Sequence, residues 1–286
     1  MPQILESNTL SDEVRLYLRR RLDDGSLDLP MLPAVAGEVV RMCDSAETDA
    51  AKLSDVLHRD PTLAGHVLRV ANSSMYMAQM PIVSLQQAIS RLGFRTLSEI
   101  AMTVSMNQRI FTSQSHQDVM ETLWDHSIAA AQFAKEIARL RRRNVESAFL
   151  CGLLHDVGKP VVLSLLDDAA RQFKVRFSLL ALHVAMQEFH LIAGVALAER
   201  WLLPKQVIET VYYHHDYASA PSCGEAAMQT CLADLLAQLV VVSSEGIDEA
   251  VVRSLPVLED LNLYPDEIDV LLQRQEQVAE MMQVIG

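Results

Sequence analysis

Apolar residues recur at helical spacing along most of the chain, and helix-capping residues stand at the ends of the runs. Asp60-Pro61 places an N-cap residue before a proline in the first turn, and Leu63 and Val67 follow on one face. No alternating pattern of useful length indicates a strand. Only 10 of 286 residues are glycine and 5% are aromatic, which is typical of helical proteins. The chain is therefore predicted to be all-α.

Two capping boxes indicate further helix starts in the first 115 residues. Ser84 with Gln87 predicts a helix that ends at Gly93, and Thr96 with Glu99 predicts the start of the next. The polar stretch TSQSHQDV, residues 112–119, then predicts a boundary between two lobes, residues 1–115 and 116–286. Later helices are expected at about 121–139, 145–157 (stopped by Gly158), 167–188, 190–202, 204–216, 225–242 and from 265 onward.

The net charge limits the partners of the protein. With 24 Lys+Arg against 37 Asp+Glu, the formal charge is −13, which argues against broad contact with nucleic acid or an anionic membrane. The runs Arg19–Arg21 and Arg141–Arg143 are interpreted as solvated helix ends paired with local acids, with an anion or nucleotide-phosphate site as the alternative.

The location is expected to be cytoplasmic. The N-terminus lacks a basic region followed by an apolar run, and no apolar stretch approaches the roughly 18 residues that a membrane span needs. The four cysteines form no CxxC pair, which suits reduced thiols packed as small apolar side chains.

Histidines and acids on separate helical segments form the candidate metal site. A divalent ion in a helical bundle is held by imidazoles and carboxylates that project inward from different helices. The candidate ligands, in chain order, are His126, His155, Asp156, His190, His214, His215 and Asp234. Mixed nitrogen and oxygen ligands favour iron, manganese, nickel or zinc over calcium, and the absence of cysteines near the histidines argues against a closed structural zinc site. The expected cofactor is one or two divalent ions of Fe, Mn, Ni, Zn or Mg. The implied chemistry is metal-assisted hydrolysis at phosphorus.

A structural interpretation of the same residues stays open. GLLHDVGKP also fits a plain helix that ends at Gly158, with Lys159 beside the negative end of the helix dipole and Pro160 enforcing the stop. Taken singly, each histidine is more often a core or surface residue than a ligand. The hypothesis of a metal site depends on the ordered set.

Six segments together resemble the HDOD family, the HD-related output domain of bacterial signalling proteins, over roughly residues 22–216. They are LPMLPAVAGEVVRM from Leu29, LHRDPTLAGHVLRVANSSMY from Leu57, QQAISRLGFRTLSEIA from Gln86, LWDHS from Leu123, AFLCGLLHDVGK from Ala148, and ERWLLP through HH from Glu199. The resemblance implies an all-α protein with an N-terminal helical bundle packed against an HD-type lobe. It also implies a signalling partner.

The resemblance extends to the metal-dependent phosphohydrolases of the HD and HD-GYP types and implies roles for single residues. His126 matches the first ligand, and His155-Asp156 matches the HD dyad. Lys159 matches the lysine that follows the dyad, so Asp156 and Lys159 are the candidate catalytic residues. The further matches are His190, His214 and His215 as ligands of a second ion, and Asp234 as the closing aspartate.

Two departures separate the chain from the HD-GYP enzymes. YASAPSCGEAA follows Asp216 in place of their G-Y-P loop, and Ala237 stands where they tend to carry a further aspartate. The leading hypothesis is therefore a regulatory HDOD protein with a metal-capable site. The alternative is a phosphohydrolase acting on a nucleotide or phosphodiester, cyclic dinucleotides included. A third hypothesis is a sensor that binds a nucleotide or phosphate without cleaving it.

Overall fold

The computed structural model describes residues 5–7, 9–23, 34–43, 45, 47–76, 81–113, 115–241 and 247–285. These residues are mostly helical, as the sequence predicts, and two three-residue strands pair in parallel, with Leu5 opposite Val175. The elements are β1 (Leu5–Ser7), α1 (Asp12–Asp23), α2 (Ala34–Cys43), α3 (Ala50–Leu57), α4 (Pro61–Ala71), η1 (Ser74–Tyr76), α5 (Leu85–Arg109), α6 (Gln117–Leu140), α7 (Val145–Leu154), α8 (Gly158–Phe173), β2 (Val175–Phe177), α9 (Leu179–Arg200), α10 (Lys205–Tyr213), η2 (Tyr217–Ser219), α11 (Gly224–Val241), α12 (Glu249–Arg253), α13 (Pro256–Asp260), α14 (Pro265–Gln273) and α15 (Gln275–Ile285).

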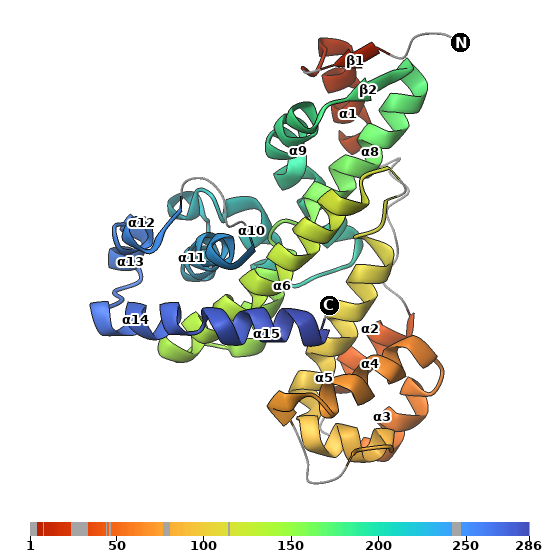
Figure 1. Ribbon diagram of the computed structural model, residues 1–286, viewed down its shortest axis with the longest axis vertical. Helices are drawn as coiled ribbons and strands as arrows, with labels where there is room; N and C mark the ends of the chain where they lie inside the picture. The colour runs from red at the N-terminus through yellow and green to blue at the C-terminus, as the bar shows by residue number, and fades with distance from the viewer. Residues whose placement is uncertain are drawn as a thin grey trace.

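The helices gather into three regions (Figure 1). Helices α2 to α5 form a bundle at one end of the molecule, with its own apolar core. Helices α1, α8 and α9 lie at the opposite end and share a core with parts of α5, α6, α7 and α10. Helices α11 to α14 pack on one side of α6 and α7 around a third core. Because α6 and α7 contribute to two of these cores, they form the centre of the larger lobe, α6 to α14. This lobe is called the HD-type lobe below, after the lobe that the resemblance predicts.

Helix α1 packs away from the bundle formed by α2 to α5. Val14, Leu18 and Leu22 are buried in the core that α8 and α9 share, and β1 pairs with β2 beside them. The first residues of the chain thus contact the HD-type lobe. The predicted division at residue 115 assigns α1 to the N-terminal lobe, whereas α1 packs on helices that follow residue 115. The division itself stays a prediction.

The C-terminal helix α15 joins the three regions. Val278 is buried in the core of α11 to α14, Met281 is buried in the core of the N-terminal bundle, and Met282 packs against the core of α1, α8 and α9. A second connection is the buried ion pair between Lys135 on α6 and Glu99 on α5, with Nζ 2.5 Å from Oε2. The bundle is therefore held to the HD-type lobe by apolar and ionic contacts together.

Some predicted helix boundaries are confirmed and others are wrong. Asp60 caps α4 by accepting from the amides of Thr62 and Leu63. Gly93 interrupts α5 with φ 78°, and Ser84 precedes that helix without a side-chain capping bond. The capping box at Thr96 is wrong, because the Glu99 carboxylate binds Lys135 instead.

The predicted boundaries between residues 155 and 202 are also wrong. Helix α7 ends at Leu154, and Gly158 begins α8 instead of stopping the preceding helix. The next break lies at residues 174–178, where Lys174 takes the left-handed conformation (φ 54°) and Ser178 caps α9. Residues 188–190 lie inside α9. The break at residues 174–178 contains β2, which pairs with β1, a strand far away in the sequence.

Two spans, Val145–Phe173 and Leu179–Arg200, are long and apolar enough to cross a membrane by length and composition, each with a mean hydropathy of 1.5. This corrects the expectation that no stretch approaches that length. The first span is two helices with a turn between them, and 83% of its most apolar window is buried inside the protein. In the second span, α9, 44% of the most apolar window is buried, and Leu179 and Leu180 are exposed at the start of the helix. The cytoplasmic location stays an expectation.

The arginine runs contact acidic side chains that lie on other helices, far away in the sequence. Arg19 lies 3.5 Å from Glu188, and Arg143 lies 2.6 Å from Glu225. These pairs favour the interpretation of solvated helix ends over that of an anion site.

Candidate metal centre

Close packing of α7 on α6 brings the first two candidate ligands together. A Cβ atom on Gly152 would lie 2.7 Å from the backbone oxygen of Ala130, so only glycine allows this approach. His126 on α6 and His155 just after α7 then face each other, with their Nε2 atoms 3.3 Å apart.

A second close approach positions Asp156. It lies in the turn between α7 and α8, and α8 begins at Gly158. A Cβ atom on Gly158 would lie 1.8 Å from the backbone oxygen of His190 and 2.6 Å from the amide nitrogen of Gly194. The absence of a side chain therefore lets α8 start against α9, and His190 lies beside the HD dyad.

The first group of candidate ligands is His126, His155, Asp156 and Asp234, whose ligand atoms all lie within 4.8 Å of one another. His126 Nε2 is 3.0 Å from Asp234 Oδ1, and His155 Nε2 is 3.3 Å from Asp156 Oδ2. All four side chains are buried.

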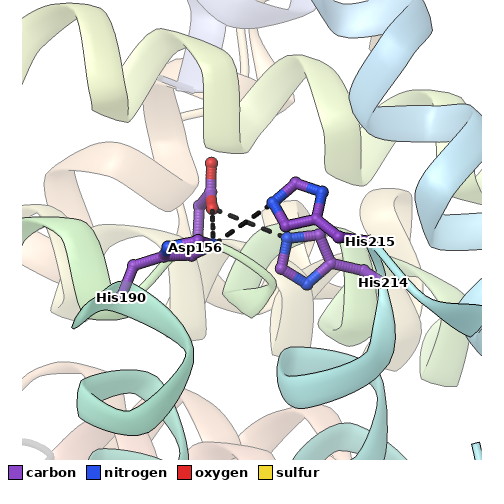
Figure 2. Close-up of side chains that lie close together, drawn as sticks. All are labelled: Asp156, His190, His214 and His215. Atoms are coloured by element: carbon purple, nitrogen blue, oxygen red, sulfur yellow. Dashed lines mark hydrogen bonds and ion pairs between the residues drawn. The ribbon is translucent and has the colours of Figure 1, made fainter. Parts of the chain in front are cut away.

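The second group is Asp156, His190, His214 and His215, which also lie within 4.8 Å of one another. Figure 2 shows the imidazole of His190 on one side of the Asp156 carboxylate and those of His214 and His215 on the other. The Nε2 atoms of His190 and His214 are 3.7 and 3.8 Å from Asp156 Oδ1, and His190 Nε2 is 3.2 Å from His215 Nε2.

Asp156 belongs to both groups, with one oxygen turned toward each. Its Oδ2 faces His126 and His155, while its Oδ1 faces His190 and His214. Both Asp156 Oδ1 and His214 Nε2 are buried without a hydrogen-bond partner among the described residues. A buried acceptor without a donor is costly, and a divalent cation would satisfy both atoms. The donor set therefore fits one metal ion, or two that share Asp156.

The orientation of three imidazoles is set by backbone carbonyls. The Nδ1 atoms of His155, His190 and His214 lie 2.7, 2.9 and 3.0 Å from the carbonyl oxygens of Gly152, Met186 and Val211 respectively. Since a carbonyl oxygen only accepts, each Nδ1 donates its proton. In the neutral rings of His190 and His214 the lone pair is left on Nε2, which points into the cluster, as in metal-binding histidines. His155 would present Nε2 in the same way once a cation displaces its second proton.

The carboxylates of the cluster are ionised. Burial opposes the charge of Asp156, but Lys159 and His155 outweigh it and hold its pKa well below the usual range. Burial likewise opposes the charge of Asp234, whose pKa is lowered by His126 and His155. Burial also disfavours the charged form of His155, yet the two carboxylates raise its pKa to about 10. The first group therefore offers two ionised carboxylates to a cation, which would replace the second proton of His155.

The imidazoles of the second group are neutral at pH 7. Burial lowers the pKa of His190 to about 4 and that of His214 to about 3, and it also lowers the pKa of His215. Neutral imidazole is the form that binds a metal ion.

A cavity of about 270 Å³ opens onto the first group. His126, Asp234 and Lys159 line its inner end, and the ammonium group of Lys159 contacts Asp156 Oδ2. A small ligand in this cavity would touch the first group and Lys159 directly.

The structure brings together all seven predicted ligand residues and places Lys159 beside them. The interpretation of GLLHDVGKP as one plain helix is wrong, because the dyad lies in a turn between two helices. Their role as metal ligands stays a proposal.

Sequence reasoning missed the polar side chains along the cavity wall. His183 and Gln187 on α9 and Gln238 on α11 line it, and Gln238 Nε2 donates to Asp234 Oδ1 at 3.2 Å. The spacing of His183, Gln187 and His190 by four and three residues places them on one helix face, which is a signal that the sequence does contain.

The segment that stands in place of the G-Y-P loop is held by hydrogen bonds to the Glu209 side chain. The Glu209 carboxylate accepts from the amide of Cys223 at 2.8 Å and from the Ser222 hydroxyl at 2.5 Å. Ala237, which stands where a further aspartate is expected, is fully buried in the core of α11 to α14.

Comparison with known proteins gives a family and solved structures that share the fold. The HDOD domain family matches residues 29–217. An uncharacterised protein of Treponema pallidum is 25% identical over 229 residues, which cover 77% of this chain and 43% of the relative; the chain thus spans less than half of that relative's length.

Two solved structures share the fold over nearly the whole chain. A protein of Shewanella amazonensis SB2B, proposed to be a metal-dependent phosphohydrolase, has a TM-score of 0.74 at 20% identity, covering 97% of this chain and 100% of its own. A Marinobacter aquaeolei VT8 protein, proposed to act in signal transduction, has a TM-score of 0.70 at 24% identity, covering 98% of this chain and 67% of its own. At these identities the likeness shows the fold alone.

Proposed function

This chain belongs to the HDOD domain family, and from that premise we propose that it is a signal-transduction protein whose HD-type lobe holds divalent metal ions around Asp156. His126, His155, Asp156 and Asp234 would hold one ion, and Asp156, His190, His214 and His215 the other. A divalent ion there supplies a Lewis acid that polarises a phosphoryl oxygen and acidifies water.

One observation carries this proposal: Oδ1 of the buried Asp156 carboxylate is unpartnered and faces His190 and His214, whose Nδ1 protons go to backbone carbonyls. Such a cluster has many acceptors and few donors, so a cation stabilises it more than any rearrangement of protons does. Nitrogen and carboxylate donors without thiolates suit Mn, Fe, Ni or Zn better than calcium.

The metal content of the purified protein tests the proposal. The wild type and the variant His155→Ala with Asp156→Ala are purified from metal-replete medium and analysed by plasma mass spectrometry. Exposed His58→Ala is the matched control, because that imidazole lies outside both groups. Metal should be present in the wild type and the control and absent from the double variant. Equal content in all three proteins would contradict the proposal.

A second candidate function is hydrolysis of a phosphate ester, favoured by the cavity that ends at Lys159 and Asp156. In that reaction water adds to phosphorus, the ester P–O bond breaks, and the leaving oxygen takes up a proton. The ammonium group of Lys159 would neutralise the charge that develops on phosphate or protonate the leaving oxygen. The Shewanella protein with the same fold is also proposed to be a phosphohydrolase.

A panel of nucleotides and phosphodiesters offered to the manganese- or iron-loaded protein tests this candidate. Phosphate release that disappears in Lys159→Ala, while the metal content stays at the wild-type level, would support it. A metal-loaded protein that turns over no member of the panel would leave regulation as the function.

A signalling partner is proposed for the N-terminal bundle. The family membership and the Marinobacter protein proposed to act in signal transduction support this role. If the protein acts purely as an adaptor, substitution of His155 and Asp156 leaves the regulatory phenotype intact, whereas surface changes on α2 to α4 abolish it. Loss of regulation in a folded dyad variant would exclude the pure adaptor.

A further inference from the structure

The wall of the cavity beyond the metal ligands carries two unengaged polar side chains. His183 and Gln187 lie one turn apart on α9 and are exposed at the cavity. In the described part of the chain neither side chain makes a hydrogen bond or ion pair. Their polar atoms are therefore available to a ligand that enters the cavity.

The positive charge at this cavity suits one phosphate group. Among the described residues that line it, Lys159 is the one lysine or arginine. Lys159 contacts Asp156, so its ammonium group and an ion held by the first group would lie side by side and bind the same phosphate. A second phosphate farther along the cavity would need another cationic group there, since phosphate is recognised chiefly by lysine, arginine and bound metal. The second half of a cyclic dinucleotide finds no such group among these residues.

The size of the cavity points the same way. Its volume of about 270 Å³ lies just below the ~300–1,000 Å³ of pockets that hold drug-sized ligands. A monoester of one sugar is small enough for such a space, whereas a cyclic dinucleotide contains two sugars, two bases and two phosphates.

The polarity of the wall indicates the chemistry of the esterified group. His183 and Gln187 present hydrogen-bonding side chains to it, and Thr122 on α6 adds a hydroxyl group. Apart from imidazoles, the described lining residues carry no aromatic ring on which a base could stack. Side chains of this kind hydrogen-bond to hydroxyl groups.

We propose that His183 and Gln187 bind the sugar hydroxyl groups of a sugar-phosphate monoester whose single phosphate lies beside Lys159. The ligand class of the site is then a sugar phosphate, free or as the sugar-phosphate part of a nucleoside monophosphate, and not a cyclic dinucleotide. This inference rests on the metal-holding site proposed above, which would bind the phosphate together with Lys159.

Calorimetric titration of the full chain loaded with manganese tests the inference. The probes are ribose 5-phosphate and pentyl phosphate, which share the phosphate and the chain length but differ in hydroxyl groups. The proteins are the wild type, the variant His183→Ala with Gln187→Ala, and the control Val184→Ala, which lies on the same helix but outside the cavity.

The wild type and the control should bind ribose 5-phosphate about tenfold more tightly than pentyl phosphate, as expected for two hydrogen bonds to neutral groups. In the double variant this preference should vanish, while the affinity for pentyl phosphate stays within about twofold. Adenosine 5′-monophosphate separates the two sources: tighter binding than ribose 5-phosphate assigns nucleotides, and weaker binding assigns free sugar phosphates.

Three results would overturn the inference: no preference for ribose 5-phosphate in the wild type, a preference that survives in the double variant, or tighter binding of cyclic di-guanosine monophosphate than of ribose 5-phosphate. Metal analysis of the same samples distinguishes a failure of this inference from a failure of the proposed function. Metal bound without a ribose preference overturns this inference alone. A wild type that takes up no metal contradicts the proposed function, and the inference fails with it.

Discussion

Substitution of Gly158 by alanine should separate α8 from α9 and disturb the candidate metal centre from outside its ligands. The added Cβ atom would lie 1.8 Å from the carbonyl oxygen of His190, where ordinary contacts begin at 3.4 Å. The oxygen must therefore retreat by about 1.6 Å, the difference between these two distances. Because the obstacles are backbone atoms of α9, no side-chain rotation relieves the clash.

The expected cost is at or above the upper end of the ~1–3 kcal/mol typical of an overpacked core. Gly65→Ala is the matched control, because Gly65 is exposed on α4 and an added Cβ atom there would meet nothing within 4 Å. That substitution should stabilise the fold by roughly 0.5–1 kcal/mol, since alanine favours a helix interior over glycine. Urea denaturation followed by circular dichroism measures both changes.

The same displacement moves Asp156 away from His190, so Gly158→Ala should also weaken metal binding, by about 10–100-fold if the effect resembles the loss of an outer-shell contact. A Gly158→Ala protein within ~0.5 kcal/mol of the wild type, the range of neutral surface changes, would refute the reasoning. Such a result would mean that α8 and α9 do not depend on this backbone contact.

Three further predictions concern groups away from the metal ligands. Lys135→Ala should cost about 3–5 kcal/mol in urea denaturation because it leaves Glu99 charged and buried without its partner, whereas Lys135→Met combined with Glu99→Gln should cost less. Hydrogen bonds from Ser222, opposed by burial, lower the pKa of Glu209 to about 2 from an ordinary 4.5. The stability that Glu209 contributes over Glu209→Gln should therefore be complete above pH 4.5 and shrink as the pH falls toward 2; a difference that does not change with pH would contradict this. Burial raises the pKa of the Cys151 thiol to about 11, so iodoacetamide at pH 8 should modify Cys151 only after unfolding. Mass spectrometry measures the rate of modification, and equal rates in native and unfolded protein would contradict the protection of this thiol by burial.

Local chemistry explains which parts of the fold could be predicted from the sequence. Asp60 caps α4 with contacts two and three residues away, so its role is visible in the sequence. Gly93 breaks the helix because it adopts φ 78°, which is also a local property. The all-α class follows from many such signals together.

Long-range contacts explain the wrong boundaries. The break before α9 contains β2, whose pairing with β1 joins residues far apart in the sequence, Leu5 and Val175. The Glu99 carboxylate accepts from Lys135, 36 residues later in the sequence, instead of capping a helix at Thr96. The packing of α1 on α8 and α9 is likewise absent from any local pattern.

The candidate site could be predicted as a set of residues but not as an arrangement. The order of histidines and aspartates indicated the candidate ligands, and the resemblance already assigned His190, His214 and His215 to a second ion. The position of Asp156 between the two groups depends on the close approach of α8 to α9 at Gly158, which the sequence does not show. His183 and Gln187 share a helix face with His190, so the cavity wall was within reach of a helical projection.

Anomalous diffraction at the manganese edge, from crystals of the full chain grown with manganese, tests the central claim most directly. The account predicts two anomalous peaks, one between His126, His155 and Asp234 and one between His190, His214 and His215, with the Asp156 carboxylate between them. An anomalous map without a peak at either group, from protein saturated with manganese, would contradict the claim that this lobe is a metal site.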